Sequence, residues 1–423
     1  MPRQYTSDTR SHALLKLTES KSDPLRPALL QDADSCVMCG MCQPHCPTYQ
    51  VYRQEAESPR GRIAMIQALA RDRLSADENL IMHLEHCLGC MACEAICPSK
   101  VPYGRLMDNA RALLNTQNKK IPIAQSLLLK SVARHNGLQC LNSLIRFYNR
   151  SGLRAGMDKL LRLTGSPQIR RAHNLLQWAD STVLKTYYPA IGAAVGNLAL
   201  FSGCLGNSFD ATTLTSSIKV LTRLGYNVHL PARKFCCGAL HQHLGHPEQA
   251  QALVQANRDC FNDLPVSHIV YAANGCGAQL KQAEMPVPVV DIVNFLLSSP
   301  ALPAVQIKPL AEKVLLHESC SSLNKLHIGG AMRKLLQFIP DLECIATGQA
   351  ASCCGAGSNH TLQFPDLSAA LIESKIADIK RLGPKYLLSD NLGCSLHLKG
   401  SLKQAGLNLE VLHPITLLAR QLG

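Results

Sequence analysis

The chain has 423 residues, of which 46% are hydrophobic and 17% charged, and its formal net charge is +13. This composition fits a soluble globular protein of roughly two to four domains. No stretch approaches about 18 uninterrupted apolar residues, so no transmembrane segment is expected. Nineteen cysteines in a chain that starts without an apolar leader predict a reducing compartment, with the cytoplasm as default, and metal ligation rather than disulfides.

Eight cysteines form two copies of one pattern, C-x2-C-x2-C-x3-C-P. The first copy is Cys36, Cys39, Cys42 and Cys46 before Pro47, and the second is Cys87, Cys90, Cys93 and Cys97 before Pro98. The pattern is typical of two-cluster bacterial ferredoxins, in which the fourth cysteine of each copy reaches the other cluster. Zinc sites and disulfides also use Cys-x2-Cys pairs, but they do not need four cysteines and a proline twice.

The pattern therefore predicts two [4Fe–4S] clusters with crossed ligands, and electron transfer as the activity. Cluster 1 is expected on Cys36, Cys39, Cys42 and Cys97, and cluster 2 on Cys87, Cys90, Cys93 and Cys46. Arg60 and Arg62 are candidates to donate hydrogen bonds near a cluster and raise its potential. A salt-bridged turn is the equal alternative for these two arginines.

A basic segment follows, from Lys119 to Thr186, with twelve Lys or Arg against two acidic residues, a net charge of +10. Its apolar residues recur at helical spacing and include Leu127, Leu128, Val132, Leu141, Leu144, Ile145, Leu160 and Leu161. Basic amphipathic helices can lie on anionic membrane surfaces. A docking face for an acidic partner subunit and an ordinary solvated face stay open as alternatives. No nucleic-acid partner is expected, because no nucleic-acid module is recognisable.

The C-terminal half repeats itself. Cys204, Cys236, Cys237 and Cys276 recur as Cys320, Cys353, Cys354 and Cys394, at offsets of 116, 117, 117 and 118 residues. Apolar runs precede the first cysteine of each copy, and helix-length segments follow, as in parallel α/β units. The cysteines are then expected in loops at one end of each sheet, where α/β proteins bind ligands.

The predicted fold class is therefore α/β (α+β overall), in four parts. We expect a helical two-cluster ferredoxin-like domain over 1–118, a basic helical linker over 119–196, and two repeated Rossmann-like cysteine-rich modules over 197–300 and 301–423. Three histidines after the first Cys-Cys-Gly, His241, His243 and His246, are expected as polar loop residues or as neighbours that shape the cysteine site, ahead of a zinc site. Cys140, Cys260 and Cys344 lie outside all motifs and are expected as buried small apolar residues.

Taken together, the chain resembles the iron–sulfur subunits of bacterial glycolate oxidases over essentially its full length. The ferredoxin motifs, Cys46-Pro-Thr-Tyr49, Pro59-Arg-Gly-Arg-Ile63 and the two Cys-Cys-Gly modules carry the resemblance. The modules look like the cysteine-rich domain shared with heterodisulfide reductase and with subunits of anaerobic glycerol-3-phosphate and lactate oxidation. In its fullest form that domain ends in Cys-x2-Cys, but here the last position is Gln279 in one module and His397 in the other.

This departure makes a further cluster or metal site a hypothesis for the second module, on Cys320, Cys353, Cys354, Cys394 and His397. The first module, with Cys204, Cys236, Cys237 and Cys276, is the weaker candidate, because glutamine is a poor cluster ligand. The resemblance implies a separate FAD subunit that oxidises a 2-hydroxy acid, glycolate first and D-lactate next, and a membrane quinone as acceptor. It also implies a peripheral place on the inner face of the inner membrane. Glycerol-3-phosphate oxidation and a heterodisulfide-reductase-like catalytic subunit are the alternatives.

No catalytic residue is predicted on this chain itself. The nearest approach to a dinucleotide fingerprint, Gly355-Ala-Gly357, lacks the third glycine, and neither a Walker motif nor a nucleophile elbow is present. The substrate-oxidising site is therefore expected on a partner subunit.

Overall fold

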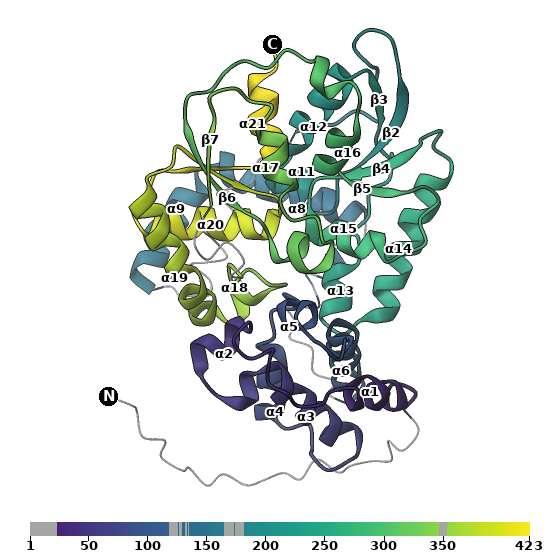
Figure 1. Ribbon diagram of the computed structural model, residues 1–423, viewed down its shortest axis with the longest axis vertical. Helices are drawn as coiled ribbons and strands as arrows, with labels where there is room; N and C mark the ends of the chain where they lie inside the picture. Colours follow the sequence, from purple (N-terminus) through teal and green to yellow (C-terminus); the bar gives the residue numbers. More distant parts are fainter. Residues whose placement is uncertain are drawn as a thin grey trace.

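The computed structural model shows a helical N-terminal part at one end of the molecule and two α/β modules at the other (Figure 1). It describes residues 23–117, 126, 129–131, 133, 135–164, 173, 182–346 and 353–423. Among these residues, no helix combines the length and the apolar character needed to cross a membrane.

The N-terminal part consists of short helices around the loops that carry the eight motif cysteines. The helices are α1 (Leu25–Asp34), α2 (Pro47–Tyr52), α3 (Pro59–Ala70), α4 (Glu78–Glu85), α5 (Ala92–Ala95) and α6 (Tyr103–Gln117), with a 3-10 turn at Glu55–Glu57. Helices α1, α3 and α6 pack together around the fully buried Leu29, Ile66 and Leu106. Ser58 begins α3, because its hydroxyl accepts from Gly61 N at 3.0 Å.

Two helices of the basic segment are described, α8 (His135–Arg150) and α9 (Leu153–Thr164), and they pack against each other. Ile145 and Leu161 are buried, whereas Leu144 and Leu160 are 60% and 51% exposed. The side chains of Leu127, Leu128, Val132 and Leu141 lie outside the described residues. The expected burial of Cys140 is wrong: this cysteine is exposed, because it lies on a face of α8 that is open to solvent. Cys260 and Cys344 are partly buried.

Each module contains a parallel sheet. The first sheet has β1 (Tyr187–Tyr188), β2 (Gly196–Phe201), β3 (Tyr226–His229), β4 (His268–Tyr271) and β5 (Val289–Asp291), in the order β1-β3-β2-β4-β5. The second has β6 (Lys313–His317), β7 (Glu343–Ala346), β8 (Tyr386–Ser389) and β9 (Glu410–Leu412), in the order β7-β6-β8-β9. Every pairing is parallel except that of β1 with β3. The added strand β1 lies in the segment that the sequence assigned to the linker.

The helices of the two modules cover both faces of these sheets. In the first module they are α11 (Gly206–Phe209), α12 (Ala211–Arg223), α13 (Ala239–His243), α14 (Pro247–Asn262), α15 (Asn274–Lys281) and α16 (Ile292–Ser298). In the second they are α17 (Ala331–Leu336), α18 (His360–Gln363), α19 (Pro365–Leu382), α20 (Leu392–Gln404) and α21 (Pro414–Gln421), with short turns at Leu302–Ala304 and Ser321–Lys325. The strand order β3-β2-β4-β5 equals β7-β6-β8-β9, so the α/β class and the repeat are confirmed.

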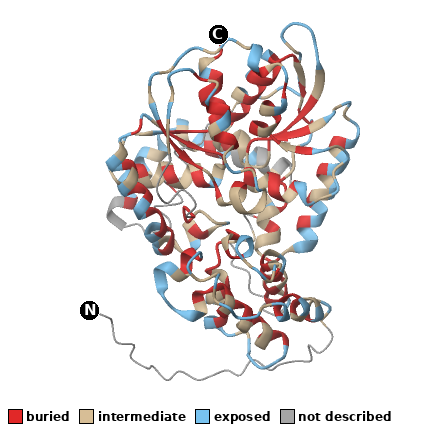
Figure 2. Ribbon diagram, in the orientation of Figure 1, coloured by how far each residue is buried: buried red, intermediate tan, exposed pale blue. Residues whose placement is uncertain are grey.

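One hydrophobic core joins the two modules. It contains β-strand residues of both sheets, such as Leu200 and Leu316, together with Ile415 of the last helix. Helix α21 packs on α12 of the first module, where Lys219 Nζ donates to Ala419 O at 2.8 Å and Arg223 donates to Gly423 O. Figure 2 shows the buried strands and helices of both modules meeting in this region. The two modules therefore share one hydrophobic core and pack as a single unit rather than as two separate domains.

The N-terminal part is joined to the first module by a contact between α6 and α13. Asn115 Nδ2 donates to Leu244 O at 2.7 Å, and Arg111 Nη1 donates to His243 O at 3.1 Å. Gly245 has φ +77°, and a Cβ there would lie 2.5 Å from Arg111 O. Only glycine fits both the backbone conformation and this close approach.

Asp291 provides a test of the packing between the modules. Its Oδ1 caps α16 by accepting from Asn294 N at 3.0 Å, while its buried Oδ2 has no hydrogen-bond partner among the described residues. Burial, followed by the nearby charge of Asp390, raises the pKa of Asp291 from 3.8 to about 7. Because the folded pKa is the higher one, the contribution of Asp291 to stability is fully present below its ordinary pKa of 3.8, and it is lost as pH rises from there through about 7.

We therefore expect Asp291→Asn, which keeps the cap, to match the wild type in stability near pH 3 and to exceed it increasingly as pH rises towards about 7. Urea unfolding followed by circular dichroism across this range measures the difference. Asp259→Asn, at an exposed position on α14, is the control for the substitution itself. A difference between Asp291→Asn and wild type that stays constant with pH contradicts the assignment.

Candidate metal centres

Two neighbouring cavities in the N-terminal part collect the eight motif cysteines. One cavity is lined by Cys36, Cys39, Cys42 and Cys97, and the other by Cys46, Cys87 and Cys90; Cys93 lines both. The fourth cysteine of each motif thus lies with the first three of the other motif. Pro59 and Tyr103 also line both cavities and separate them, together with Cys93.

The two cavities differ in exposure. Around the first, Cys39 is exposed and Cys36, Cys42 and Cys97 are half-buried. Around the second, all four cysteines are buried. Burial raises the pKa of the Cys90 and Cys93 thiols, since a lone thiolate is poorly solvated there. Thiolates at these positions need bound cations as compensation, so the donor set fits iron–sulfur clusters.

The two cysteine loops have the same backbone shape. Met38 and Gly40 flank Cys39, and Gly89 and Met91 flank Cys90, and all four flanking residues have positive φ. A left-handed residue on each side of the central cysteine curls the chain around one point, with the three sulfurs turned inward. A Cβ on Gly40 would also lie 2.9 Å from Arg60 Nη1. The motif spacing alone therefore determines this local geometry twice.

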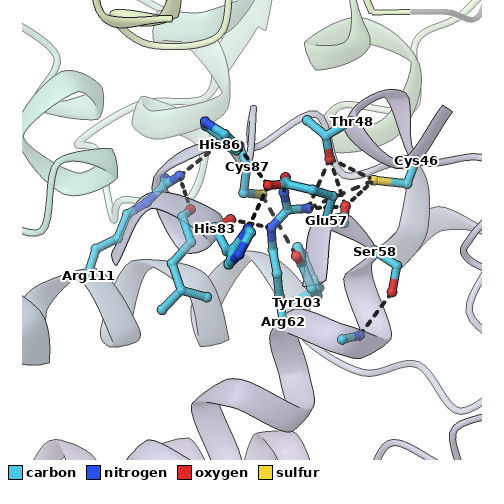
Figure 3. A network of polar contacts seen from close by, with 12 residues as sticks. Cys46, Thr48, Glu57, Ser58, Arg62, His83, His86, Cys87, Tyr103 and Arg111 are labelled. Carbon is cyan, nitrogen blue, oxygen red and sulfur yellow. Dashed lines mark hydrogen bonds and ion pairs between the residues drawn. The ribbon is translucent and has the colours of Figure 1, made fainter. Parts of the chain in front are cut away.

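Arg62 runs through the interior beside the second cavity (Figure 3) and is 1% exposed. Its Nη2 forms an ion pair with Glu57 Oε2 at 2.5 Å, and its Nε donates to His83 O at 2.7 Å. Its Nη1 donates to Thr48 Oγ1 at 3.0 Å and lies 3.9 Å from Cys46 Sγ. One guanidinium thus makes a salt bridge and approaches a motif sulfur, and its effect on the potential of a cluster stays a prediction.

Glu57 is the buried counter-charge of this network. Its Oε1 lies 2.7 Å from Nδ1 of both His83 and His86. Although burial raises the pKa of Glu57, the hydrogen bond with His86 and the charge of Arg62 hold this pKa below its ordinary value. Glu57, His83 and His86 have the composition of a metal site, with donor atoms within 4.8 Å. The carboxylate charge is, however, already compensated by the guanidinium of Arg62.

Arg60 lies at the surface beside the first cavity. Its Nε forms an ion pair with Glu55 Oε1 at 2.7 Å, and its Nη1 donates to Met38 O at 3.2 Å. The Arg60 side chain therefore fixes the backbone of the first cysteine loop rather than touching a sulfur.

In both modules the cysteines follow the carboxyl ends of three adjacent parallel strands, as expected. Cys204, Cys236–Cys237 and Cys276 follow β2, β3 and β4, while Cys320, Cys353–Cys354 and Cys394 follow β6, β7 and β8. The glycine after each cysteine pair is required by the fold. Gly238 and Gly355 have φ of +91° and +83°, and a Cβ would lie 2.8 Å from Ala250 O or 2.9 Å from Ser368 O.

The thiols of each module form a hydrogen-bonded series. In the first, Cys236 accepts from Cys204 and Cys237, which lowers its pKa well below the ordinary value, and it also bonds with His241. In the second, Cys354 bonds with Cys353 and Cys394, and Cys353 bonds with Cys320. His243 instead pairs with Asp108 Oδ1 at 3.0 Å, and His246 precedes α14. The histidine trio is therefore dispersed, and only His241 contacts a cysteine site.

The second module places a different histidine beside its cysteines than the sequence suggested. His317, at the end of β6, has a ring nitrogen within 4.8 Å of the sulfurs of Cys354 and Cys394. His397 Nε2 lies 3.3 Å from Ser368 O. Burial, then the charge of Lys375, lowers the pKa of His317 to about 3, so its imidazole is neutral. The Cys-Cys-Gly spacing gave no signal for His317, and a histidine that ends an apolar strand was the one available clue.

This second site directly adjoins the second ferredoxin cavity. Leu88 and Cys90 pack with Cys353, and Cys320 lies against the same group. Asn324 Nδ2 donates to Cys90 O at 2.8 Å, which fixes the loop after β6 to the second motif. A Cβ on Gly357 would lie 2.6 Å from Leu88 O, so the two loops are in tight contact.

Comparison with known proteins agrees with this geometry. Residues 32–101 match the model of a 4Fe-4S dicluster domain, and residues 198–281 and 314–399 match that of the cysteine-rich domain. The probable glycolate oxidase iron-sulfur subunit of Bacillus subtilis (strain 168) is 30% identical over 403 residues, which cover 89% of this chain and 90% of the relative. The chain belongs to the glycolate oxidase iron–sulfur subunit family.

Two further relatives place the family in a wider group. The glycolate oxidase iron-sulfur subunit of Escherichia coli (strain K12) is 26% identical, over 87% of this chain and 91% of its own. Lactate utilization protein A of Shouchella clausii (strain KSM-K16) is 25% identical, over 51% of this chain and 96% of its own. Members of the family are iron–sulfur proteins, and this chain carries the two-cluster domain together with both cysteine-rich repeats.

The buried ion pair yields a prediction for the second cavity. Arg62→Leu leaves Glu57 buried without its cation, and breaking a buried pair costs about 3–5 kcal/mol of unfolding free energy. We expect a loss of that size in chemical denaturation, together with loss of one cluster in iron analysis. Arg71→Leu, directly after the same helix and in an exposed pair with Asp34, is the matched control.

Adding Glu57→Gln to Arg62→Leu should recover part of the lost stability, because the orphaned charge is then removed. Equal losses in Arg62→Leu and Arg71→Leu, or no recovery in the double variant, contradict the role assigned to this pair.

Proposed function

We propose that this chain is the electron-transfer subunit of a flavin-dependent glycolate dehydrogenase, which oxidises glycolate to glyoxylate. A partner subunit with FAD carries the oxidation, and electrons leave for a membrane quinone. The observation that carries the proposal is the pair of adjoining cysteine cavities, one open to solvent and one buried. Membership in the glycolate oxidase family supports the substrate.

We propose crossed ligation of the two clusters. Cluster 1 is assigned to Cys36, Cys39, Cys42 and Cys97, and cluster 2 to Cys87, Cys90, Cys93 and Cys46. The support is that each set lines one cavity. When bound, such clusters accept one electron at a time and so divide the two electrons of a reduced flavin. The chain's own residues hold the two sites side by side, exclude water from the inner one and place Arg62 near Cys46.

Electrons are proposed to enter at cluster 1. Its loop exposes a group of large apolar side chains beside the exposed Cys39, with Val37 69%, Met38 41% and Met41 51% exposed. An apolar surface around a redox centre fits a docking face, because a partner that covers it gains hydrophobic contact and shortens the path to the cluster. The occupant proposed for this face is the FAD subunit.

A location on the inner face of the inner membrane is proposed from the basic segment. The net charge of +10 between Lys119 and Thr186 accompanies exposed apolar side chains on α8 and α9. Leu144, Phe147, Leu153 and Leu160 are 51–64% exposed. Positive charge beside exposed apolar side chains suits anionic lipid, and it would keep this cytoplasmic chain near its quinone acceptor.

Crossed ligation has a direct test. Cys97→Ser lies in the second motif but should remove cluster 1, so the remaining EPR signal of the reduced protein should match that of Cys39→Ser. Cys46→Ser should likewise match Cys90→Ser. In each variant about four irons per chain should be lost, and dye reduction should stop while substrate still reduces the partner's flavin. If the EPR signal of Cys97→Ser instead matches that of Cys90→Ser, the ligation is not crossed. Undiminished electron flow in all variants refutes the relay.

The docking face has its own test. Val37→Asp places a charge in the proposed contact, and loss of one buried apolar side chain is worth about 1.5–3 kcal/mol, or roughly tenfold or more in affinity. We expect that weakening for binding to the co-expressed FAD subunit in biolayer interferometry, with both clusters intact. Val183→Asp, at an 85% exposed position elsewhere, is the control. Equal affinity of the two variants contradicts the entry face.

A further inference from the structure

We propose that the second cysteine-rich module binds a single divalent transition-metal ion, of the zinc type, with His317 as its nitrogen ligand and Cys354 and Cys394 as thiolate ligands. The site is separate from the two ferredoxin clusters and does not depend on the substrate proposed above. It also differs from the ligand set that the repeat suggested, which included His397.

The spacing of the donors fits one ion. A ring nitrogen of His317 and the sulfurs of Cys354 and Cys394 all lie within 4.8 Å of one another. Two donors on one tetrahedral ion are about 3.5–3.8 Å apart, given metal–sulfur and metal–nitrogen bonds of about 2.3 and 2.0–2.1 Å. Small side-chain movements are therefore enough to close the site. A fourth donor is available in Cys353, whose thiol is hydrogen-bonded to Cys354.

The ferredoxin cysteines provide an internal comparison. Although they line shared cavities, no three of them form a group as compact as His317, Cys354 and Cys394 in the described part of the chain. Donors that hold separate corners of a cluster must stay farther apart than donors that share one ion. The cysteines of the second module thus have the spacing expected for a mononuclear centre, and the ferredoxin cysteines do not; the other compact group, Glu57 with His83 and His86, is already paired with Arg62.

His317 also has a buried ring nitrogen without a hydrogen-bond partner among the described residues. Its side chain is 4% exposed, and Nε2 has no hydrogen-bond partner among the described residues, which omit 347–352. A buried polar atom without a partner is unfavourable, because it has lost its hydrogen bonds to water. Coordination of the ion through Nε2 would remove this penalty.

The repeat shows that this histidine is specific to the second module. Phe201 occupies the matching position at the end of β2, since Phe201 pairs with Tyr271 as His317 pairs with Ser389. Phe201 packs near Phe261, with ring centroids 6.4 Å apart, and offers no donor atom. Among the described residues, no compact donor group occurs in the first module. The same fold position therefore serves packing in one copy and metal binding in the other.

The donor set selects the class of metal. Thiolates with an imidazole favour zinc or iron over calcium and magnesium, which prefer oxygen ligands. Measuring zinc and iron per chain distinguishes a zinc ion from an iron ion, and a single ion of either metal from an additional cluster.

The test compares the purified full chain with variants that install the residue of the first module. His317→Phe mimics Phe201, and His397→Gln mimics Gln279. Zinc and iron per chain are measured by plasma mass spectrometry after anaerobic purification. The EPR of the two ferredoxin clusters reports whether each variant is folded. We expect about one ion per chain beyond the eight irons in wild type and His397→Gln, and loss of that ion in His317→Phe with unchanged EPR.

Co²⁺ reconstitution gives the geometry, because ligand-field and thiolate-to-cobalt bands report a tetrahedral site with sulfur ligands. His317→Cys, which restores a soft donor, should recover the bound ion and shift these bands. If His317→Phe does not fold, His317→Cys provides the test instead. This variant should fold and bind one ion per chain if position 317 supplies a ligand. Wild type with eight irons and no further metal overturns the proposal. Loss of the ion in His397→Gln alone, or equal loss in both variants, also overturns the proposal. Four additional irons per chain in place of one ion overturn it as well.

Discussion

The interlocking of the two cysteine motifs is the constraint on which the rest of this structure depends. Cys97 lies with the first motif and Cys46 with the second, so neither cavity can form unless residues about fifty positions apart are brought together. Tyr103 begins α6 in the wall between the cavities, and α6 then carries the contact to the first module. The position of the modules over the clusters thus follows from the way the motifs close on each other.

Charge is the second requirement of such a site. Clusters bound by thiolates concentrate negative charge in an apolar interior. Arg62, which is buried between Cys46 and Glu57, supplies a compensating positive charge. Glu57 in turn orders His83 and His86. His86 stacks on Tyr52 at 5.3 Å and meets Phe364 of the second module edge-on at 4.6 Å. The electrostatic support of the inner cavity therefore continues directly into the interface with that module.

Local rules were enough for much of this architecture. Cysteine spacing predicted two loops of one kind, which the structure shows with left-handed residues beside Cys39 and Cys90, and the 117-residue repeat predicted two parallel α/β modules, whose strand order only the structure gives. Spacing could not reveal Glu57, His86 or His317, because these residues act through long-range contacts that no local pattern encodes. Cys140 shows the same limit in reverse: this cysteine was expected to be buried, but the structure leaves it exposed on α8.

The two modules have the same fold and different surroundings, which explains why their sites diverged. The first meets the N-terminal part through backbone carbonyls of His243 and Leu244, and Arg111, which donates to His243 O, also donates to Cys87 O of the second motif. The second presses Cys353 and the loop after β6 against Cys90, so any movement of its strand ends disturbs the inner cavity. A metal ion bound by His317 and Cys354 would hold these strand ends rigid where rigidity protects a cluster. In the first module the matching strand end carries Phe201, which packs near Phe261 and offers no donor atom for a metal.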